Sequence, residues 1–198
     1  MKEILPGVHH WTSKHPKIKI EVSSYYLADE KVALDPLVPA GGLDALPGPV
    51  EHVILTNRHH HRQSADFVRQ FGCTVWASAP GMHEFTHGEK VRPFQFGDTL
   101  PGGIEAIEIG ELCPDETALF VARAGGLLAL ADGAERTKDA PLRFVEDDLI
   151  GDDPPAVKAG LKRAYSRLLD RPFGTLLLAH GWPIVGKGKE ALRGFVGG

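Results

Sequence analysis

Residues 50–77, VEHVILTNRHHHRQSADFVRQFGCTVWA, contain the clearest structural pattern in the chain. The apolar run at residues 50–56 predicts a short buried strand. Residues 64–71 predict a helix, and Gly72 follows them where a left-handed cap would end it. Residues 73–77 predict another strand. Together these segments predict a β-α-β unit, whose two strands run parallel because a helix connects them.

Strand patterns flank this unit on both sides. Before it, Ile18, Ile20 and Val22 alternate with charged residues, which predicts a half-buried strand. Later, Asp153-Pro154 predicts the start of a helix, with an N-cap residue followed by proline at the first helical position. The remaining strands are predicted at residues 24–27, 31–34, 91–96, 104–109, 118–122, 127–131 and 173–179, and a last helix at 189–195. This mixture predicts an α+β or α/β fold in which packed sheets are covered by helices.

The composition is that of a globular protein and excludes several classes of partner. With 198 residues, 42% of them hydrophobic, the chain is long enough to bury one core, and we expect a single domain over residues 1–198. A net charge of −4 gives no basic field for nucleic acid or an anionic membrane. Two cysteines make no disulfide scaffold, and no signal-peptide or membrane-spanning pattern is present. We therefore expect a cytoplasmic protein whose partner is a small molecule.

Polar side chains follow three apolar runs at the point where each predicted strand ends. Residues 57–62, NRHHHR, follow VILT, Asp132 follows LLALA, and His180 follows TLLLA. Strand ends in such folds open onto clefts, so we expect the three positions to converge on one pocket. Trp11 and Trp182 are candidates for lining it, whereas we expect the histidines of the polar N-terminal segment, His9, His10 and His15, to be solvated.

This order of residues resembles the metallo-β-lactamase superfamily. Its members carry Thr-His-x-His-x-Asp-His after a strand, then a third histidine, an aspartate after a strand and a last histidine near the C-terminus. The resemblance extends from about Ser24 to Trp182 and implies a four-layer αβ/βα sandwich. Thr56 matches the threonine of the motif, His59 its second histidine, Asp132 the bridging aspartate and His180 the last histidine.

Other positions of the motif are altered. Asn57 replaces the first histidine, His61 takes the place of the aspartate, and Arg62 replaces the adjacent histidine, while His60 falls on an unassigned position. Glu111 and Cys113 are the ligating side chains nearest to the missing third histidine. A guanidinium offers no lone pair to a metal, and at ~5 Å it repels a divalent ion by roughly 6–7 kcal/mol for an effective dielectric of ~20.

The resemblance therefore implies either no metal or one divalent ion, with zinc the leading choice. Its expected ligands are His59, His180, Asp132 and His61, with Glu111 or Cys113 as alternatives at the third-histidine position. The leading hypothesis is a hydrolase of a small ester, thioester or lactone. In that hypothesis His61 or Asp132 positions or deprotonates the water, and Arg62 binds a substrate carboxylate or an oxyanion.

Two alternatives remain open. The first is a non-catalytic protein in which Arg62 replaces a metal and holds an anionic small molecule. The second is a structural role for a buried Arg62–Asp132 ion pair. Unpaired strand edges also leave homo-oligomer formation open.

Overall fold

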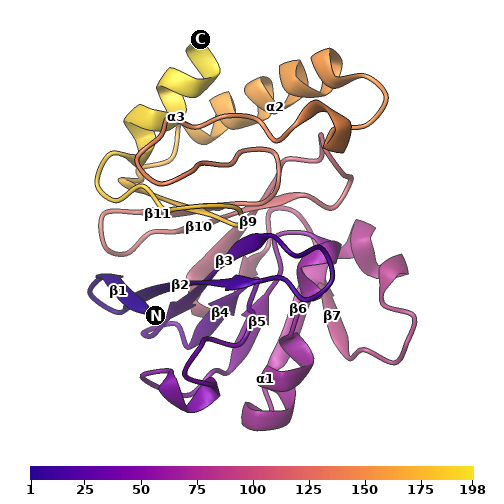
Figure 1. Ribbon diagram of the computed structural model, residues 1–198, viewed down its shortest axis with the longest axis vertical. Helices are drawn as coiled ribbons and strands as arrows, with labels where there is room; N and C mark the ends of the chain where they lie inside the picture. Colours follow the sequence, from indigo (N-terminus) through magenta and orange to yellow (C-terminus); the bar gives the residue numbers. More distant parts are fainter.

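The computed structural model describes residues 1–198 and contains two mixed sheets that pack face to face (Figure 1). The first sheet has seven strands in the order of the chain. They are β1 (Lys2–Leu5), β2 (Val8–Lys14), β3 (Glu21–Leu27), β4 (Val32–Leu34), β5 (His52–Ile54), β6 (Thr74–Ser78) and β7 (Val91–Phe94). Strands β1 to β4 pair antiparallel, and β4 to β7 pair parallel.

The second sheet has five strands in the spatial order β12-β11-β10-β9-β8. They are β8 (Thr99–Leu100), β9 (Ile104–Glu108), β10 (Thr117–Val121), β11 (Leu127–Leu130) and β12 (Thr175–Leu178). Only β11 and β12 pair parallel. Strands β10 to β12 are apolar at nearly every position because both faces of this sheet are covered.

Helices cover the outer face of each sheet. Helix α1 (Ser64–Phe71) lies against the first sheet, and α2 (Pro154–Leu168) and α3 (Gly188–Gly197) lie against the second (Figure 1). Five short 3₁₀ segments complete the structure: η1 (Leu43–Ala45), η2 (Arg58–His61), η3 (Ala79–Glu84), η4 (Pro101–Gly103) and η5 (Asp147–Leu149). The order helix, sheet, sheet, helices is the four-layer αβ/βα sandwich implied by the sequence. No helix is both long and apolar enough to cross a membrane.

The core is divided among the three interfaces between these layers. Leu27 and Ile54 of the first sheet meet Leu119 and Leu177 of the second in the central interface. A second cluster joins the five-stranded sheet to α2 and α3, and a third joins the seven-stranded sheet to α1. Each fully buried aliphatic side chain contributes about 1.5–3 kcal/mol, so the sandwich holds the strand ends of both sheets in fixed positions.

The predicted β-α-β unit is confirmed. Strands β5 and β6 are parallel neighbours joined by α1, and Gly72 ends the helix with φ 66°. The predicted start of α2 is also confirmed, because the Asp153 carboxylate accepts a hydrogen bond from Ala156 N at 3.0 Å.

Two expectations for the N-terminal segment are wrong. Residues 15–20 form a turn, in which Nδ1 of His15 accepts hydrogen bonds from two backbone N–H groups, so Ile18 and Ile20 are 58% and 47% exposed. The strand β2 was not predicted, because its sequence VHHWTSK is largely polar. His10 on this strand is buried rather than solvated, and its Nε2 lies 2.9 Å from Ser23 Oγ.

Candidate active site

The strand ends predicted to converge lie at one edge of the sandwich. Strands β11 and β12 run parallel with Leu130 beside Leu178, so Asp132 and His180 leave the sheet side by side, each two residues further on. The end of β5 leads through Thr56 into the 3₁₀ segment η2 at the same edge. Segments about 50 to 120 residues apart in the chain are thereby brought together.

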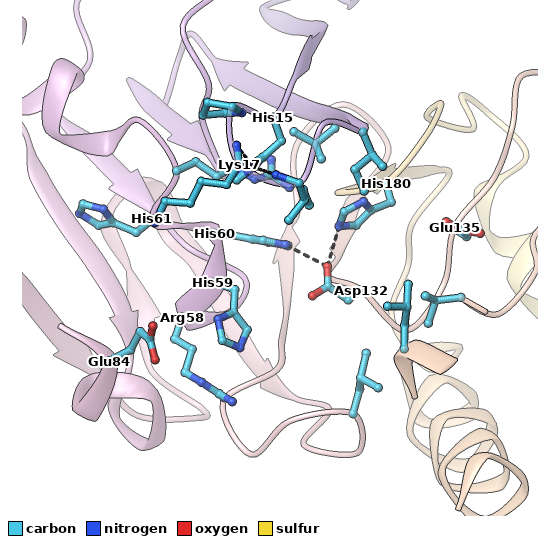
Figure 2. A pocket seen from close by; sticks show the side chains of 18 of the residues that line it. His15, Lys17, Arg58, His59, His60, His61, Glu84, Asp132, Glu135 and His180 are labelled. Atoms are coloured by element: carbon cyan, nitrogen blue, oxygen red, sulfur yellow. Dashed lines mark hydrogen bonds and ion pairs between the residues drawn. The ribbon is translucent and has the colours of Figure 1, made fainter. Parts of the chain in front are cut away.

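His60, Asp132 and His180 form a compact triad. Nε2 of His60 lies 2.9 Å from Oδ1 of Asp132, and Nε2 of His180 lies 2.8 Å from the same oxygen. Figure 2 shows the two rings approaching the carboxylate from two sides. Each of the three residues offers one atom that could bind a metal ion, and these three atoms lie within 4.8 Å of one another. Oδ1 is buried, and the two imidazole nitrogens are its nearest polar neighbours.

The local conformation explains why His60, rather than His59, joins the triad. Asn57 caps η2 by accepting a hydrogen bond from His59 N at 2.9 Å. In a 3₁₀ turn, residues three apart lie on the same side, so Asn57 and His60 point the same way. Both contact Asp132, and the Asn57 amide donates to Oδ2 at 2.7 Å. The family motif places its ligands at every second residue, so its match to this sequence selected His59 and His61. The 3₁₀ turn has a period of three residues and does not preserve that spacing.

A buried carboxylate orients His60. Nδ1 of His60 lies 3.0 Å from Oδ2 of Asp35 and 2.9 Å from the Thr56 hydroxyl, and that hydroxyl donates to Asp35 at 2.6 Å. Burial by itself would lower the pKa of His60, but the charges of Asp132 and Asp35 outweigh it and raise that pKa to about 9. Burial would likewise raise the pKa of Asp132, but the positive charge of His60 holds it well below its ordinary value. No pattern in the sequence marks Asp35 as part of the site.

Arg62 does not form the expected ion pair with Asp132. Its Nη1 donates to the carbonyl oxygens of Ser23 and Asp35, both at 2.7 Å, while its Nη2 is buried without a partner. The backbone of Arg62 has φ 44°, a left-handed conformation that is costly for a non-glycine residue. Arg62 thus connects β3 to the loop after β4, and it is also one of the residues that line the cavity beside the triad.

The other expected ligands lie outside the triad. His59 is exposed, and the half-buried ring of His61 packs 5.7 Å from that of Phe85, although both histidines line the cavity. The carboxylate of Glu111 packs against Gly160 of α2. Burial, together with neighbouring carboxylates, raises the pKa of Cys113 far above its ordinary value, which disfavours the thiolate that binds metals. Leu112, between these two residues, lines the cavity at the third-histidine position.

Glu116 supports the Asp132 loop from within the core. It is fully buried, and its two oxygens accept hydrogen bonds from Gly133 N at 3.1 Å and Leu112 N at 3.3 Å. Burial, with a contribution from the charge of Asp132, raises the pKa of Glu116 to about 7. An acidic residue directly before the apolar strand β10 was the only sequence signal for this role.

The triad lies at a cavity of about 630 Å³. The turn at residues 15–20 contributes apolar side chains to its wall, including Ile18 and Ile20, and Leu149 contributes from η5. Arg58 lines another part of the wall and is held by an ion pair with the buried Asp115. A triad of ionisable groups therefore faces a space whose walls are partly apolar.

Comparison with solved structures identifies the architecture. A metallo-β-lactamase family protein from Thermus thermophilus matches with a TM-score of 0.69 and 16% identity, covering 98% of this chain and 80% of that one. A metallo-β-lactamase superfamily protein from Sulfolobus tokodaii matches with a TM-score of 0.65 and 12% identity, covering 96% and 85%. A metallo-β-lactamase from Cronobacter sakazakii matches with a TM-score of 0.60 and 16% identity, covering 89% and 76%.

Comparison at the level of sequence gives no match, because neither a protein-family model nor a curated protein matches this chain. At identities of 12–17% the structural likeness concerns the backbone arrangement and not the activity. It extends over nearly the whole chain and includes both sheets and their covering helices. The chain therefore has the metallo-β-lactamase fold.

Proposed function

We propose that this protein binds one divalent metal ion, zinc by preference, through His60, Asp132 and His180, and hydrolyses a small ester, thioester or lactone. The observation that carries the proposal is the convergence of one potential ligand atom from each of these residues within 4.8 Å, with the imidazole nitrogens of His60 and His180 at 2.9 Å and 2.8 Å from Oδ1 of Asp132. A cation bound among these three atoms would satisfy the oxygen.

The residues present fit a metal. Two imidazoles and one carboxylate are a known catalytic zinc ligand set, and three protein ligands leave a position open for water. Metal-binding histidines usually have their other ring nitrogen bound to a carboxylate or carbonyl group, and Asp35 provides this contact to Nδ1 of His60. Oδ2 of Asp132 is engaged by Asn57, and the guanidinium of Arg62 lies near the site, so the same residues disfavour a second ion.

Each residue of the site has a role in the proposed reaction. A bound divalent ion would supply a water of lowered pKa and a polarised substrate carbonyl, which are what acyl hydrolysis requires. Asp35 and Thr56 keep the His60 ring in one orientation. Of the two residues expected from the sequence to position or deprotonate the water, Asp132 lies in the triad and His61 does not. Asn57 engages Oδ2 of Asp132 and the ion would engage Oδ1, so we assign Asp132 to position the attacking water, whose proton passes to solvent. The apolar wall would exclude bulk water from the reacting group.

Metal analysis combined with hydrolysis assays tests the proposal. The protein is purified without an affinity tag, its metal content is measured, and hydrolysis of 4-nitrophenyl acetate, a simple acyl thioester and a γ-lactone is followed. We expect His60→Ala and His180→Ala to lose both metal and hydrolysis, whereas His83→Ala retains both, because His83 is exposed and does not line the cavity. Hydrolysis that survives chelation and both triad substitutions would rule the proposal out.

One observation favours a second candidate, a non-catalytic protein that holds an anionic small molecule. Nη2 of Arg62 is a buried donor without an acceptor, and Arg62 lines the cavity. A carboxylate could pair with this group, since arginine binds carboxylates through directed hydrogen bonds. Calorimetric titration of the chelator-treated protein with acetate and inorganic phosphate tests this candidate. Binding that Arg62→Gln abolishes, together with an absence of tight metal, would favour it over the hydrolase.

A further inference from the structure

A second, smaller cavity opens directly beside the triad. It has a volume of about 300 Å³ and shares His180, Ile20 and Glu135 with the larger cavity. The segment that follows Asp132 supplies much of its wall, including Arg136 and Lys138. A molecule lying across the boundary between the two cavities would contact the triad at one end and this wall at the other.

Backbone contacts fix this wall relative to His180. Arg136 N donates to His180 O at 3.3 Å, and Trp182 N donates to Arg136 O at 3.2 Å. Gly181, between His180 and Trp182, has φ 93°, and a Cβ there would lie 1.7 Å from Arg136 O. Only glycine permits this approach. The spacing between the wall and the triad is therefore set by the main chain.

The wall presents positive charge that has no anionic partner in the protein. Two acidic side chains line the cavity: Glu135 is paired with Arg143 at 2.7 Å, whereas Glu21 accepts a hydrogen bond from Thr12 at 3.4 Å and keeps its negative charge. Neither Arg136 nor Lys138 forms an ion pair. Arg136 donates only a long hydrogen bond to Pro183 O at 3.4 Å, and its Nε is buried without an acceptor. The wall therefore carries three cations against two carboxylates, and Arg136 and Lys138 are free to pair with an anion.

An indole ring completes the wall. Trp182 is 39% exposed, and the ammonium group of Lys138 lies 5.5 Å from its ring centroid. The ring of His10 meets the indole edge-on at 5.6 Å, which holds Trp182 in place. An exposed aromatic ring beside an unpaired cation is suited to a ligand with a planar apolar group and a negative charge.

We propose that this second cavity binds the non-reacting end of the substrate, and that this end is an aromatic carboxylate. The anion pairs with Lys138 and Arg136, and the aromatic ring packs on Trp182. The assignment of this end to a substrate rests on the proposed hydrolase function, but the binding of an aromatic carboxylate does not. An aryl phosphate has a similar charge and shape, so the experiment includes both anions.

Nuclear magnetic resonance of the chelator-treated 198-residue chain tests the binding. The ¹⁵N-labelled protein has three indole N–H signals, and Trp182→Phe assigns that of Trp182. We expect benzoate to shift the Trp182 signal saturably, with phenyl phosphate equal or weaker, and benzyl alcohol to bind at least ten times more weakly. Lys138→Gln should weaken benzoate binding at least five-fold. Tighter binding of phenyl phosphate than of benzoate would overturn the carboxylate assignment.

One control separates this site from other charges. Arg92→Gln removes a cation that lies 4.9 Å over the ring of Trp76, outside both cavities, and should change benzoate binding less than two-fold. Equal affinity for benzoate and benzyl alcohol, or for wild type and Lys138→Gln, would overturn the inference. Lys138 is exposed, so its substitution leaves the fold intact.

Hydrolysis of phenyl acetate and of 4-acetoxybenzoate, which differ by one carboxylate, provides the kinetic test. We expect Lys138→Gln to raise KM for 4-acetoxybenzoate at least five-fold while kcat, and KM for phenyl acetate, stay unchanged. If benzoate binds as described but neither ester is hydrolysed, the hydrolase proposal fails and the binding site stands. If both esters are hydrolysed and Lys138→Gln affects neither KM nor benzoate binding, the hydrolase stands and the second site is overturned.

Discussion

The side-chain amide of Asn57 donates a hydrogen bond to Oδ2 of Asp132 at 2.7 Å. An amide N–H has no lone pair to share with a metal, so this contact engages one carboxylate oxygen without adding a ligand. The other oxygen, Oδ1, faces both imidazoles of the triad. The carboxylate of Asp132 can therefore serve one ion but cannot bridge two while Asn57 holds it.

The first prediction concerns the number of metal ions and their ligands. We expect the tag-free protein to bind no more than one equivalent of zinc in a calorimetric titration, and His60→Ala to abolish that binding. His59→Ala should leave it unchanged, because His59 is exposed and stands outside the triad. Two tight equivalents, or loss of zinc on substitution of His59 and not of His60, would contradict the structure of the site.

The second prediction is that Arg62→Gln tightens zinc binding. A divalent ion and a unit positive charge ~10 Å apart repel by about 3 kcal/mol at an effective dielectric of ~20, and the Arg62 guanidinium lies beside the triad. After allowance for screening and relaxation, we expect a gain in affinity on the order of ten-fold to a hundred-fold. The measurement is competition with a zinc chelator, with circular dichroism to check the fold. Unchanged or weaker affinity in a folded variant would show that Arg62 does not oppose the metal.

The sequence predicted the strand ends better than the side chains that follow them. Asp132 and His180 come directly after apolar strands in a parallel pair, so their convergence follows from the strand pattern. The identity of the third member depended on a four-residue 3₁₀ turn, in which the period changes from two to three residues. Three consecutive histidines carry no internal signal of which one faces the cleft. That choice is made by Asn57 and Asp35, which lie in contact with the turn only after folding.

The N-terminal strands show the same limit. The sequence VHHWTSK of β2 has few apolar residues, and its place in the sheet comes from seven paired positions with β3. Conversely, the alternation of Ile18 and Ile20 resembled a strand but belongs to a turn at the cavity wall. Local periodicity was a weaker signal here than pairing with distant segments.

The third prediction concerns the buried charge network. Asp35 is 3% exposed and contacts His60 Nδ1, Thr56 N and Thr56 Oγ1. Asp35→Ala leaves a buried positive imidazole, the backbone N–H of Thr56 and the Thr56 hydroxyl without their partner, so we expect a loss of about 3–5 kcal/mol in the free energy of unfolding. Asp29→Ala, which removes a 73% exposed carboxylate 3.5 Å from Arg123, should cost less than about 0.5 kcal/mol. Urea denaturation of the metal-free proteins measures both, and equal effects would contradict this account of Asp35.

The last prediction uses the fully buried Glu116, whose pKa is raised from 4.5 to about 7, chiefly by burial. Between those two pH values folded Glu116 holds a proton that it has released in the unfolded chain, so the contribution of Glu116 to the free energy of unfolding falls as pH rises from 4.5 to 7 and is level outside that window. The full effect corresponds to about 3 kcal/mol.

Glu116→Gln cannot ionise, so we expect its stability relative to wild type to improve by up to that amount between pH 4.5 and 7.5, even though it loses one acceptor for Gly133 N or Leu112 N. Urea denaturation of the chelator-treated proteins at four pH values measures the difference, and Glu108→Gln, at an exposed position of β9, should show no such trend. A difference that is constant with pH, or that moves the other way, would mean that Glu116 is ionised in the folded core and that its contacts outweigh the cost of burying its charge.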